Sequence, residues 1–237
     1  MFREQTYLSI ILKKQPYNEG DELITAFTKE AGKLRLLAKS VKLQKAKLQS
    51  GLQQLFLVQL TLTSSNLPKI IGAEAVEPFM GLRENLAAVK CAFYASELAL
   101  KFTPDEQKNE ALFNLLREFF SFLNSGAKQK ILDLALAKFK INILQTLGLD
   151  ISTLEDSKFF SNSLGGFGNR QSADARQVHE PAVTLFTSLK DCRFDYLHNI
   201  EVGEDIHLQE LQNLLSQFVE YQLERKVLSE GYLNHVV

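Results

Sequence analysis

Hydrophobic and polar positions alternate along the first third of the chain. In the run GKLRLLAKS, Leu34, Leu36 and Ala38 would share one face of a strand, with Leu37 as the exception, because successive side chains of a strand point to opposite faces. Runs of this kind, separated by turn residues, predict five strands: residues 6–14, 22–28, 33–41, 55–63 and 67–75. Five short strands suit a small β-barrel.

The hydrophobic period changes from two to about 3.6 residues near Glu77 and Pro78. Beyond this point, apolar stripes predict three helices: residues 82–100, 112–123 and 128–147. The third helix is apolar on most sides, which predicts that it is central and buried, with Gly148 as its C-terminal cap. The sequence therefore predicts an α+β protein, with a five-stranded barrel in residues 1–78 and an all-helical bundle in residues 79–237.

Positive charge is concentrated in the predicted barrel. Residues 1–80 carry eleven Lys and Arg against seven Asp and Glu, whereas the remainder carries sixteen against twenty-one. Alternation puts one group of cations on the strand face opposite the apolar residues, and a second group follows on a loop: Lys33, Arg35 and Lys39, then Lys42, Lys45 and Lys47. Such a surface can bind nucleic acid through its phosphates. The alternative is that these lysines only keep the sheet soluble and discourage edge pairing.

Aromatic side chains that could stack on bases are few in this region. Phe27 and Phe56 lie inside apolar runs and are predicted to belong to the core, which leaves Tyr7 and Tyr17 as candidates for base stacking. Binding would then be mainly electrostatic and indifferent to base sequence.

Short motifs follow one another along the whole chain. In the predicted barrel they are YxExD (17–21), TxFTKExGK (25–33), AK (38–39), GLQ (51–53) and AE (73–74). In the helical part they are YxxEL (94–98), FxxxILxxLG (139–148), YxLE (221–224), KVLS (226–229) and YL (232–233). In order and spacing these motifs resemble the RecO family of bacterial DNA repair and recombination mediators.

The resemblance implies a function and partners. RecO proteins have an OB-fold as their first domain, bind single- and double-stranded DNA and promote annealing. With RecR, they help to load the RecA recombinase onto strands coated by single-strand-binding protein. On this interpretation the chain is a non-enzymatic mediator. A protein-interaction adaptor that has lost its DNA role is the alternative.

The resemblance also implies a site for the acidic, aromatic-ending tail of single-strand-binding protein. Such a ligand calls for a hydrophobic pocket rimmed by Lys or Arg. We expect this pocket at the third helix, at Lys138, Phe139 and Lys140. The alternative is that these lysines only solvate one edge of a buried helix.

One segment departs from the family pattern. Many RecO proteins insert a four-cysteine zinc site after the Leu-Gly that ends the third helix, but this chain offers only Cys192 there, with His179 and His198. Structural zinc needs four ligands in paired short spacings, so we predict no bound metal and an irregular insertion over residues 149–206. The Ser-, Asn- and Gly-rich stretch 161–172 is expected to be a flexible loop.

The sequence lacks the usual marks of an enzyme or a membrane protein. It contains neither a phosphate-binding GK[ST] loop nor a GxSxG or HExxH motif, so we expect neither catalysis nor a cofactor. No apolar run approaches the roughly eighteen residues of a membrane span, and the first residues do not resemble a signal peptide. We expect a cytoplasmic protein that associates with the nucleoid when it is active.

Overall fold

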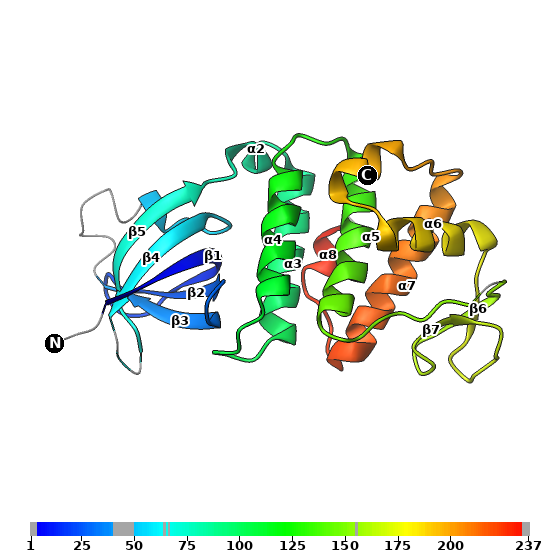
Figure 1. Ribbon diagram of the computed structural model, residues 1–237, viewed down its shortest axis with the longest axis horizontal. Coiled ribbons are helices and arrows are strands. Elements are labelled where there is room, and N and C mark those ends of the chain that lie inside the picture. The colour runs from blue at the N-terminus through cyan, green and yellow to red at the C-terminus, as the bar shows by residue number, and fades with distance from the viewer. Residues whose placement is uncertain (1–3, 40–49, 64, 66, 155, 234–237) are drawn as a thin grey trace. The chain divides into compact units, whose positions relative to one another are not determined.

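The computed structural model of the chain describes residues 4–39, 50–63, 65, 67–154 and 156–233. The chain folds as two compact units, Met1–Gly126 (unit 1) and Ala127–Val237 (unit 2). Unit 1 contains the strands that the sequence predicts and the first helices, and unit 2 contains the remaining helices (Figure 1). Within the described residues, no helix combines the length and the apolar character that crossing a membrane requires.

Unit 1 begins with a five-stranded antiparallel sheet in the order β3-β2-β1-β4-β5. Its strands are β1 (Glu4–Pro16), β2 (Glu22–Thr28), β3 (Gly32–Ala38), β4 (Leu57–Thr63) and β5 (Ile70–Glu77). The predicted fold class is therefore confirmed: a five-stranded sheet consistent with an OB-fold precedes a helical region.

The alternation seen in the sequence becomes the inner face of this sheet. Leu34, Leu36 and Ala38 of β3 lie in one buried cluster with Val58 and Leu60 of β4. Their burial removes apolar surface from water, at about 25 cal/mol per Å². This packing fixes the register, because a shift by one residue would turn the apolar side chains outward.

Strand β3 lies at one edge of the sheet, and other segments cover that edge. The Leu37 N–H donates to the Pro68 carbonyl over 2.9 Å, and Leu37 forms a parallel bridge with Lys69, just before β5. Nearer the start of β3, the Glu106 N–H donates to the Lys33 carbonyl over 2.8 Å. Gly32 has a φ of +73°, and a Cβ there would lie 1.9 Å from the Gln107 carbonyl oxygen. The chain passes so close at this point that only glycine fits.

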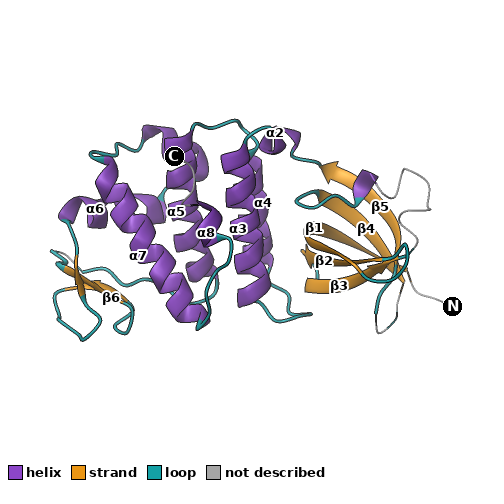
Figure 2. Ribbon diagram, turned by 180° about the vertical axis from the view of Figure 1, so that it is seen from behind, coloured by secondary structure: helices purple, strands orange, loops and turns teal. Residues whose placement is uncertain are grey.

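After the sheet, the described part of unit 1 continues with α2 (Met80–Arg83), α3 (Leu86–Phe102) and α4 (Glu110–Leu123). The side chains of Asn85 and Asn109 accept hydrogen bonds from backbone N–H groups in the first turns of α3 and α4, as expected of N-cap residues. The buried stripe of α4 includes Leu112, Leu116 and Phe119. Two of the three predicted helices, here α3 and α4, are thereby confirmed (Figure 2).

Unit 2 is built around α5 (Gln129–Thr146), which packs most extensively against three other elements. These are α6 (Glu180–Asp191), the 3-10 helix η1 (Phe194–Asn199) and α7 (Asp205–Leu223), and a short α8 (Glu230–Leu233) follows. Most of α5 is buried, as predicted. Gly148 follows its end with a φ of +73°, and its N–H donates to the Gln145 carbonyl while that of Leu149 donates to Leu144. This is the predicted glycine cap.

Residues between α5 and α6 form a small sheet in the order β7-β6-β8. Its strands are β6 (Phe159–Ser161), β7 (Gly166–Gly168) and β8 (Arg176–Gln177). The Phe160 and Phe167 rings meet edge to face, with centroids 4.8 Å apart. The prediction of a flexible loop over 161–172 is therefore wrong, since a buried aromatic pair orders this part of the chain.

The Asp174 side chain provides a second source of order in this sheet. Its carboxylate accepts hydrogen bonds from the hydroxyl groups of Ser161, Ser163 and Ser172. These bonds favour the ionised form and hold the pKa of Asp174 well below its usual range, those from Ser163 and Ser172 contributing most. A polar composition that indicated flexibility therefore supplies a hydrogen-bonded turn.

Candidate nucleic-acid interface

The outward-facing side of the sheet carries cations from neighbouring strands. In the strand register, Lys13 of β1 lies opposite Thr25 of β2, and Thr25 lies opposite Arg35 of β3. Neighbouring strands are about 4.8 Å apart. The Cα atoms of Lys13 and Arg35, two strands apart, therefore lie about 10 Å from each other, with both side chains on one face. Lys13 is exposed, and the Arg35 side chain is 63% exposed.

Lys33 does not belong to this exposed set. It has the same strand parity as Arg35, but it is only 8% exposed. Its ammonium donates to the carbonyl oxygens of Leu100 and Thr103 and pairs with Asp105 at 3.2 Å. The prediction that it faces solvent or a polyanion is wrong, because the end of α3 covers this part of the face. A cation suits a helix C-terminus, where carbonyl groups lack partners within the helix.

Arg35 is accessible but already has an acidic partner. Its Nε lies 3.0 Å from Oδ2 of Asp105, the same carboxylate that pairs with Lys33 through Oδ1. An ion pair this exposed contributes only about 0–1 kcal/mol. A phosphate group could therefore compete for Arg35 at little cost, while Asp105 would keep its bond to Lys33.

Two more cations lie near the end of β3. Lys39 directly follows the strand and is exposed, and the exposed Lys69 is bridged to Leu37, two residues before Lys39. We call Lys13, Arg35, Lys39 and Lys69 the basic face. The predicted contacts on the loop lie outside the described residues: Lys42, Lys45 and Lys47.

Sequence reasoning missed two members of the basic face. Lys13 is the exposed residue after Leu12 in the predicted first strand, so alternation could have indicated it. Lys69 had no such signal, because its place beside β3 follows from the bridge to Leu37 across thirty-two residues of chain. Only tertiary structure brings it to this surface.

A shallow cleft of about 270 Å³ lies on the same side of the sheet. Its lining combines strand side chains with the end of α3 and the residues after it: Lys13, Gln15, Leu23, Thr25, Lys33, Arg35, Leu100 and Asp105. Most of these side chains can form hydrogen bonds or ion pairs. The cleft thus offers an extended ligand two accessible cations and two neutral polar side chains, beside the Asp105 carboxylate.

The aromatic candidates differ in their surroundings. Tyr17 is 52% exposed in the turn between β1 and β2. Tyr7 is partly buried against the sheet core, and its hydroxyl donates to Oε1 of Gln5 over 2.6 Å. Phe27 and Phe56 are buried, as predicted. Tyr17 is therefore the more accessible of the two tyrosines for a base.

The residues predicted to bind a partner's tail lie inside unit 2. Lys138, Phe139 and Lys140 are 2%, 0% and 1% exposed. The Lys138 ammonium donates to the Leu189 carbonyl over 3.1 Å and lies 5.4 Å from the centre of the Phe194 ring. A peptide could reach this ammonium only after the side chains around it move, and Phe194 is one of them. The expectation of lysines on a pocket rim, or on a solvated edge, therefore does not describe this conformation.

Lys140 is buried on another side of α5. Its ammonium binds the Oε1 atoms of Gln212 and Glu230, at 3.1 and 3.2 Å, and the Ser216 hydroxyl at 2.6 Å. These partners come from α7 and α8. The lysine thus joins three helices of unit 2 through one buried charge.

Cys192, His179 and His198 do not fit the four-ligand zinc site of the family that this sequence resembles. Cys192 Sγ makes a long 3.6 Å contact with the Leu189 carbonyl, and burial raises the pKa of its thiol, which disfavours the metal-binding thiolate. Among the described residues, neither His179 nor His198 gathers with Cys192 in a group of potential metal ligands. A thiolate-based zinc site is therefore not formed by this set.

Comparisons with known proteins cover nearly the whole chain. The family model "Recombination protein O N terminal" matches residues 1–79, and "Recombination protein O C terminal" matches residues 83–230. A DNA repair protein RecO from Dehalococcoides mccartyi strain CBDB1 is 26% identical over 232 residues, covering 92% of this chain and 90% of that protein. One from Moorella thermoacetica is 27% identical over 244 residues, with coverages of 96% and 89%.

Proposed function

Because the chain belongs to the RecO family of DNA repair proteins, we propose that it is a DNA-binding recombination mediator. It would bind and anneal DNA strands and, with RecR, help to load recombinase onto single strands coated by single-strand-binding protein. Its place of action would be the cytoplasm, on the nucleoid when DNA is damaged. The basic face of unit 1 is the observation that carries this proposal.

The proposed contact is electrostatic. Lys13, Arg35, Lys39 and Lys69 would each neutralise a phosphate, and the lysines of residues 40–49 would extend the surface. Phosphate contacts of this kind hold a strand without reading its sequence. Two strands held in this way repel each other less, because their charge is partly neutralised, and this favours annealing without any bond being made or broken. The proposal therefore requires neither a catalytic residue nor a cofactor.

The exchange at Arg35 gives this surface a particular property. Free protein pairs Arg35 with Asp105, and bound protein would pair it with a phosphate. Asp105 retains the ammonium of Lys33, so the release of Arg35 leaves no isolated carboxylate. In this proposal Lys33 is a positioning residue that keeps Asp105 and Arg35 in place, rather than a phosphate contact.

A salt titration tests the DNA contact. If about four to six phosphates are neutralised, the logarithm of affinity should fall with the logarithm of salt concentration with a slope of about 3 to 5. The double variant Arg35→Gln/Lys39→Gln should lower this slope by about 1.4 for single strands and about 1.8 for duplex DNA. Fluorescence anisotropy of a labelled oligonucleotide measures both values.

The matched control neutralises two exposed arginines of unit 2, Arg170→Gln/Arg176→Gln. It changes the net charge by the same amount, and its slope should equal that of the wild type. If both double variants shift the slope equally, only the overall charge matters and the basic face is not the site. An unchanged slope in the Arg35 and Lys39 variant would favour the protein-interaction adaptor.

For the acidic tail of single-strand-binding protein we propose a site at Lys138 that opens when Phe194 moves. The tail's carboxylate would replace the Leu189 carbonyl at the ammonium, and its aromatic residue would take the place of the Phe194 ring. The contacts of Lys138 with these two groups support the exchange, since both resemble the chemistry of the tail. Phe139 and Lys140 would support α5 from within.

Removing the ring that covers Lys138 tests this site. Phe194→Ala should bind a labelled tail peptide several times more tightly than the wild type, because the Phe194 ring no longer has to be displaced. Lys138→Met should lose binding while its circular dichroism spectrum stays the same. Phe186→Ala provides a control, since it removes another buried ring of unit 2 that is packed against Phe167. Equal tightening in both Phe variants would indicate general loosening and remove the site from the proposal.

A further inference from the structure

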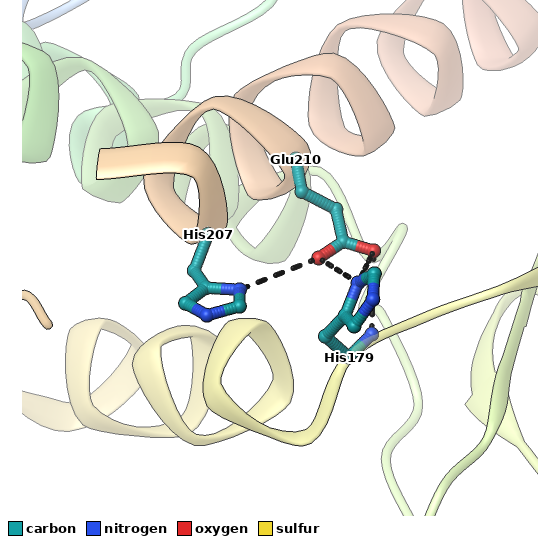
Figure 3. Close-up of side chains that lie close together, drawn as sticks. All are labelled: His179, His207 and Glu210. Carbon is teal, nitrogen blue, oxygen red and sulfur yellow. Dashed lines mark hydrogen bonds and ion pairs between the residues drawn. The ribbon is translucent and has the colours of Figure 1, made fainter. Parts of the chain in front are cut away.

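Three potential metal ligands meet in unit 2, and none of them is among the residues proposed to bind DNA or the tail. His179 is the residue before α6, while His207 and Glu210 lie in the first turns of α7. The spacing of three residues puts His207 and Glu210 on the same side of the helix. Figure 3 shows the two imidazole rings and the carboxylate turned toward a common point.

The distances are those of donors that could share one ion. His179 Nδ1 lies 3.2 and 3.1 Å from the two carboxylate oxygens of Glu210, and His207 Nδ1 lies 3.9 Å from Oε2. One donor atom from each of the three residues lies within 4.8 Å of the others. Metal–ligand bonds of about 2.0–2.1 Å in a tetrahedron put ligand atoms about 3.3–3.4 Å apart. Small side-chain rotations would close the remaining gap.

The environment of His207 points to a missing partner. Its Nδ1 atom is buried, and within the described chain it makes no hydrogen bond. The 3.9 Å separation from Glu210 is too long for one. A buried polar atom without a hydrogen bond is energetically unfavourable. An ion bound between the three side chains would give this nitrogen its partner.

The cluster is also open to solvent on one side. The His179 side chain is 72% exposed, whereas those of His207 and Glu210 are 20% and 19% exposed. A cleft of about 310 Å³ reaches His207, and its lining includes Glu180 and Glu201. An ion could therefore enter beside His179, and water could occupy its fourth coordination position.

We propose that His179, His207 and Glu210 bind one divalent transition-metal ion of the zinc class. Two imidazole nitrogens and a carboxylate oxygen suit Zn²⁺, Co²⁺, Ni²⁺ or Cu²⁺, whereas Mg²⁺ and Ca²⁺ prefer an all-oxygen set. The positive ends of α6 and α7 oppose a cation here. The Glu210 charge offsets this effect, and Glu180 and Glu201 add negative charge nearby.

The ion would join the start of α6 to the start of α7. At present one carboxylate forms this connection, because Glu210 also accepts the backbone N–H of His179 over 3.3 Å. A metal would add two strong bonds to His179 and His207 and hold the insertion against the last long helix. This revises the expectation of no bound metal, which considered His179 with Cys192 and His198 rather than with its neighbours in the folded chain.

Zinc binding to the full chain tests the proposal. The metal-free protein is titrated with Zn²⁺ by isothermal titration calorimetry, and with Co²⁺ by visible absorption, which reports the ligand geometry. We expect one ion per chain and a rise in the melting temperature. His179→Ala, His207→Ala and Glu210→Gln should each weaken binding at least tenfold, since loss of a supporting residue alone can cost that much.

Two variants separate this site from other zinc ligands. Cys192→Ser and His198→Ala should bind Zn²⁺ as tightly as the wild type. We expect His179→Ala to fold normally, because the side chain is mostly exposed and does not cap α6. Its circular dichroism spectrum checks this. The proposal is overturned if the wild type shows no saturable binding, if binding survives in His179→Ala and His207→Ala, or if it depends on Cys192.

Discussion

Strand β3 and helix α5 each carry a pair of basic residues spaced two positions apart, and the two pairs differ in the burial of their side chains. In β3, Lys33 and Arg35 point to the same side of the sheet, yet one is buried and the other is exposed. In α5, Lys138 and Lys140 point in different directions around the helix, yet both are buried. Spacing sets the direction in which a side chain points, but the neighbouring elements decide whether water reaches it.

The comparison also shows what a buried lysine requires. Lys33 and Lys138 donate to backbone carbonyl groups, and Lys140 donates to side chains of α7 and α8. A buried cation is tolerated only when its hydrogen bonds are made. Cations on the surface carry no such requirement, and they can change partners as Arg35 is proposed to do.

The largest expected effect on stability is at Lys140, where replacing a buried lysine tests the comparison most directly. Lys140→Met should lower the free energy of unfolding by about 3 kcal/mol, because it leaves Glu230 without its buried partner. Urea denaturation followed by circular dichroism measures the loss. Lys130→Met is the control on the same helix, since Lys130 forms an exposed pair with Asp205, and it should change stability by about 0–1 kcal/mol. Equal losses would mean that burial does not distinguish the two lysines.

A smaller loss is expected at Lys33. Lys33→Met should lower the free energy of unfolding by about 2 kcal/mol, because the carbonyl groups of Leu100 and Thr103 lose their donor. Arg35→Met, on the same strand, should cost about 0–1 kcal/mol while it weakens DNA binding. The two variants should thus have different defects: Lys33→Met loses stability, and Arg35→Met loses affinity for DNA. A Lys33 variant of normal stability would contradict the assignment of Lys33 as a positioning residue.

The smallest effect concerns Asp133, an acid on α5. Burial raises the pKa of its carboxyl group, with the Gln129 amide opposing the shift. The native state therefore binds this proton more tightly than the unfolded chain, whose value is near 3.8. The group's favourable contribution is complete below that pH and is lost as the pH rises through the higher native pKa. Asp133→Asn should remove this dependence, so its stability relative to wild type should increase between about pH 4 and pH 7.

Denaturant titrations at several pH values measure this difference. Asp191→Asn, at the end of α6, is the comparison for a carboxylate in unit 2 without the same burial. If Asp133→Asn and wild type keep a constant difference in stability from pH 3 to pH 7, the carboxylate does not titrate as its surroundings indicate.

Periodicity alone predicted the strands of the first sheet and the helices α3, α4 and α5, because these elements bury one face or are buried throughout. It also predicted the glycine cap after α5, since a left-handed residue at a helix end favours glycine. It did not predict α7. It failed where a surface is covered from a distance in the chain. Nothing near Lys33 in the sequence indicates that residues 100–105 lie over it, and nothing near His179 indicates that α7 brings Glu210 within 3.2 Å.

The prediction for the segment between α5 and α6, which forms the small sheet, failed for a different reason. Residues rich in Ser, Asn and Gly usually remain solvated, but here Phe160 and Phe167 supply a buried contact, and Asp174 collects the neighbouring hydroxyl groups. Composition averages over such pairs and misses them. One carboxylate placed among three serines changes a polar stretch into a defined turn.

The covered edge of β3 has a consequence for crowding. An unpaired strand edge is a template on which another chain can extend the sheet, and this is a common route to aggregation. In β3 the Lys33 carbonyl is taken by Glu106, and the Leu37 N–H is taken by Pro68. If several copies bound side by side on one DNA strand, each would meet its neighbours at high local concentration. The Lys33 carbonyl and the Leu37 N–H are therefore not available for one copy to recruit the next into a growing fibre.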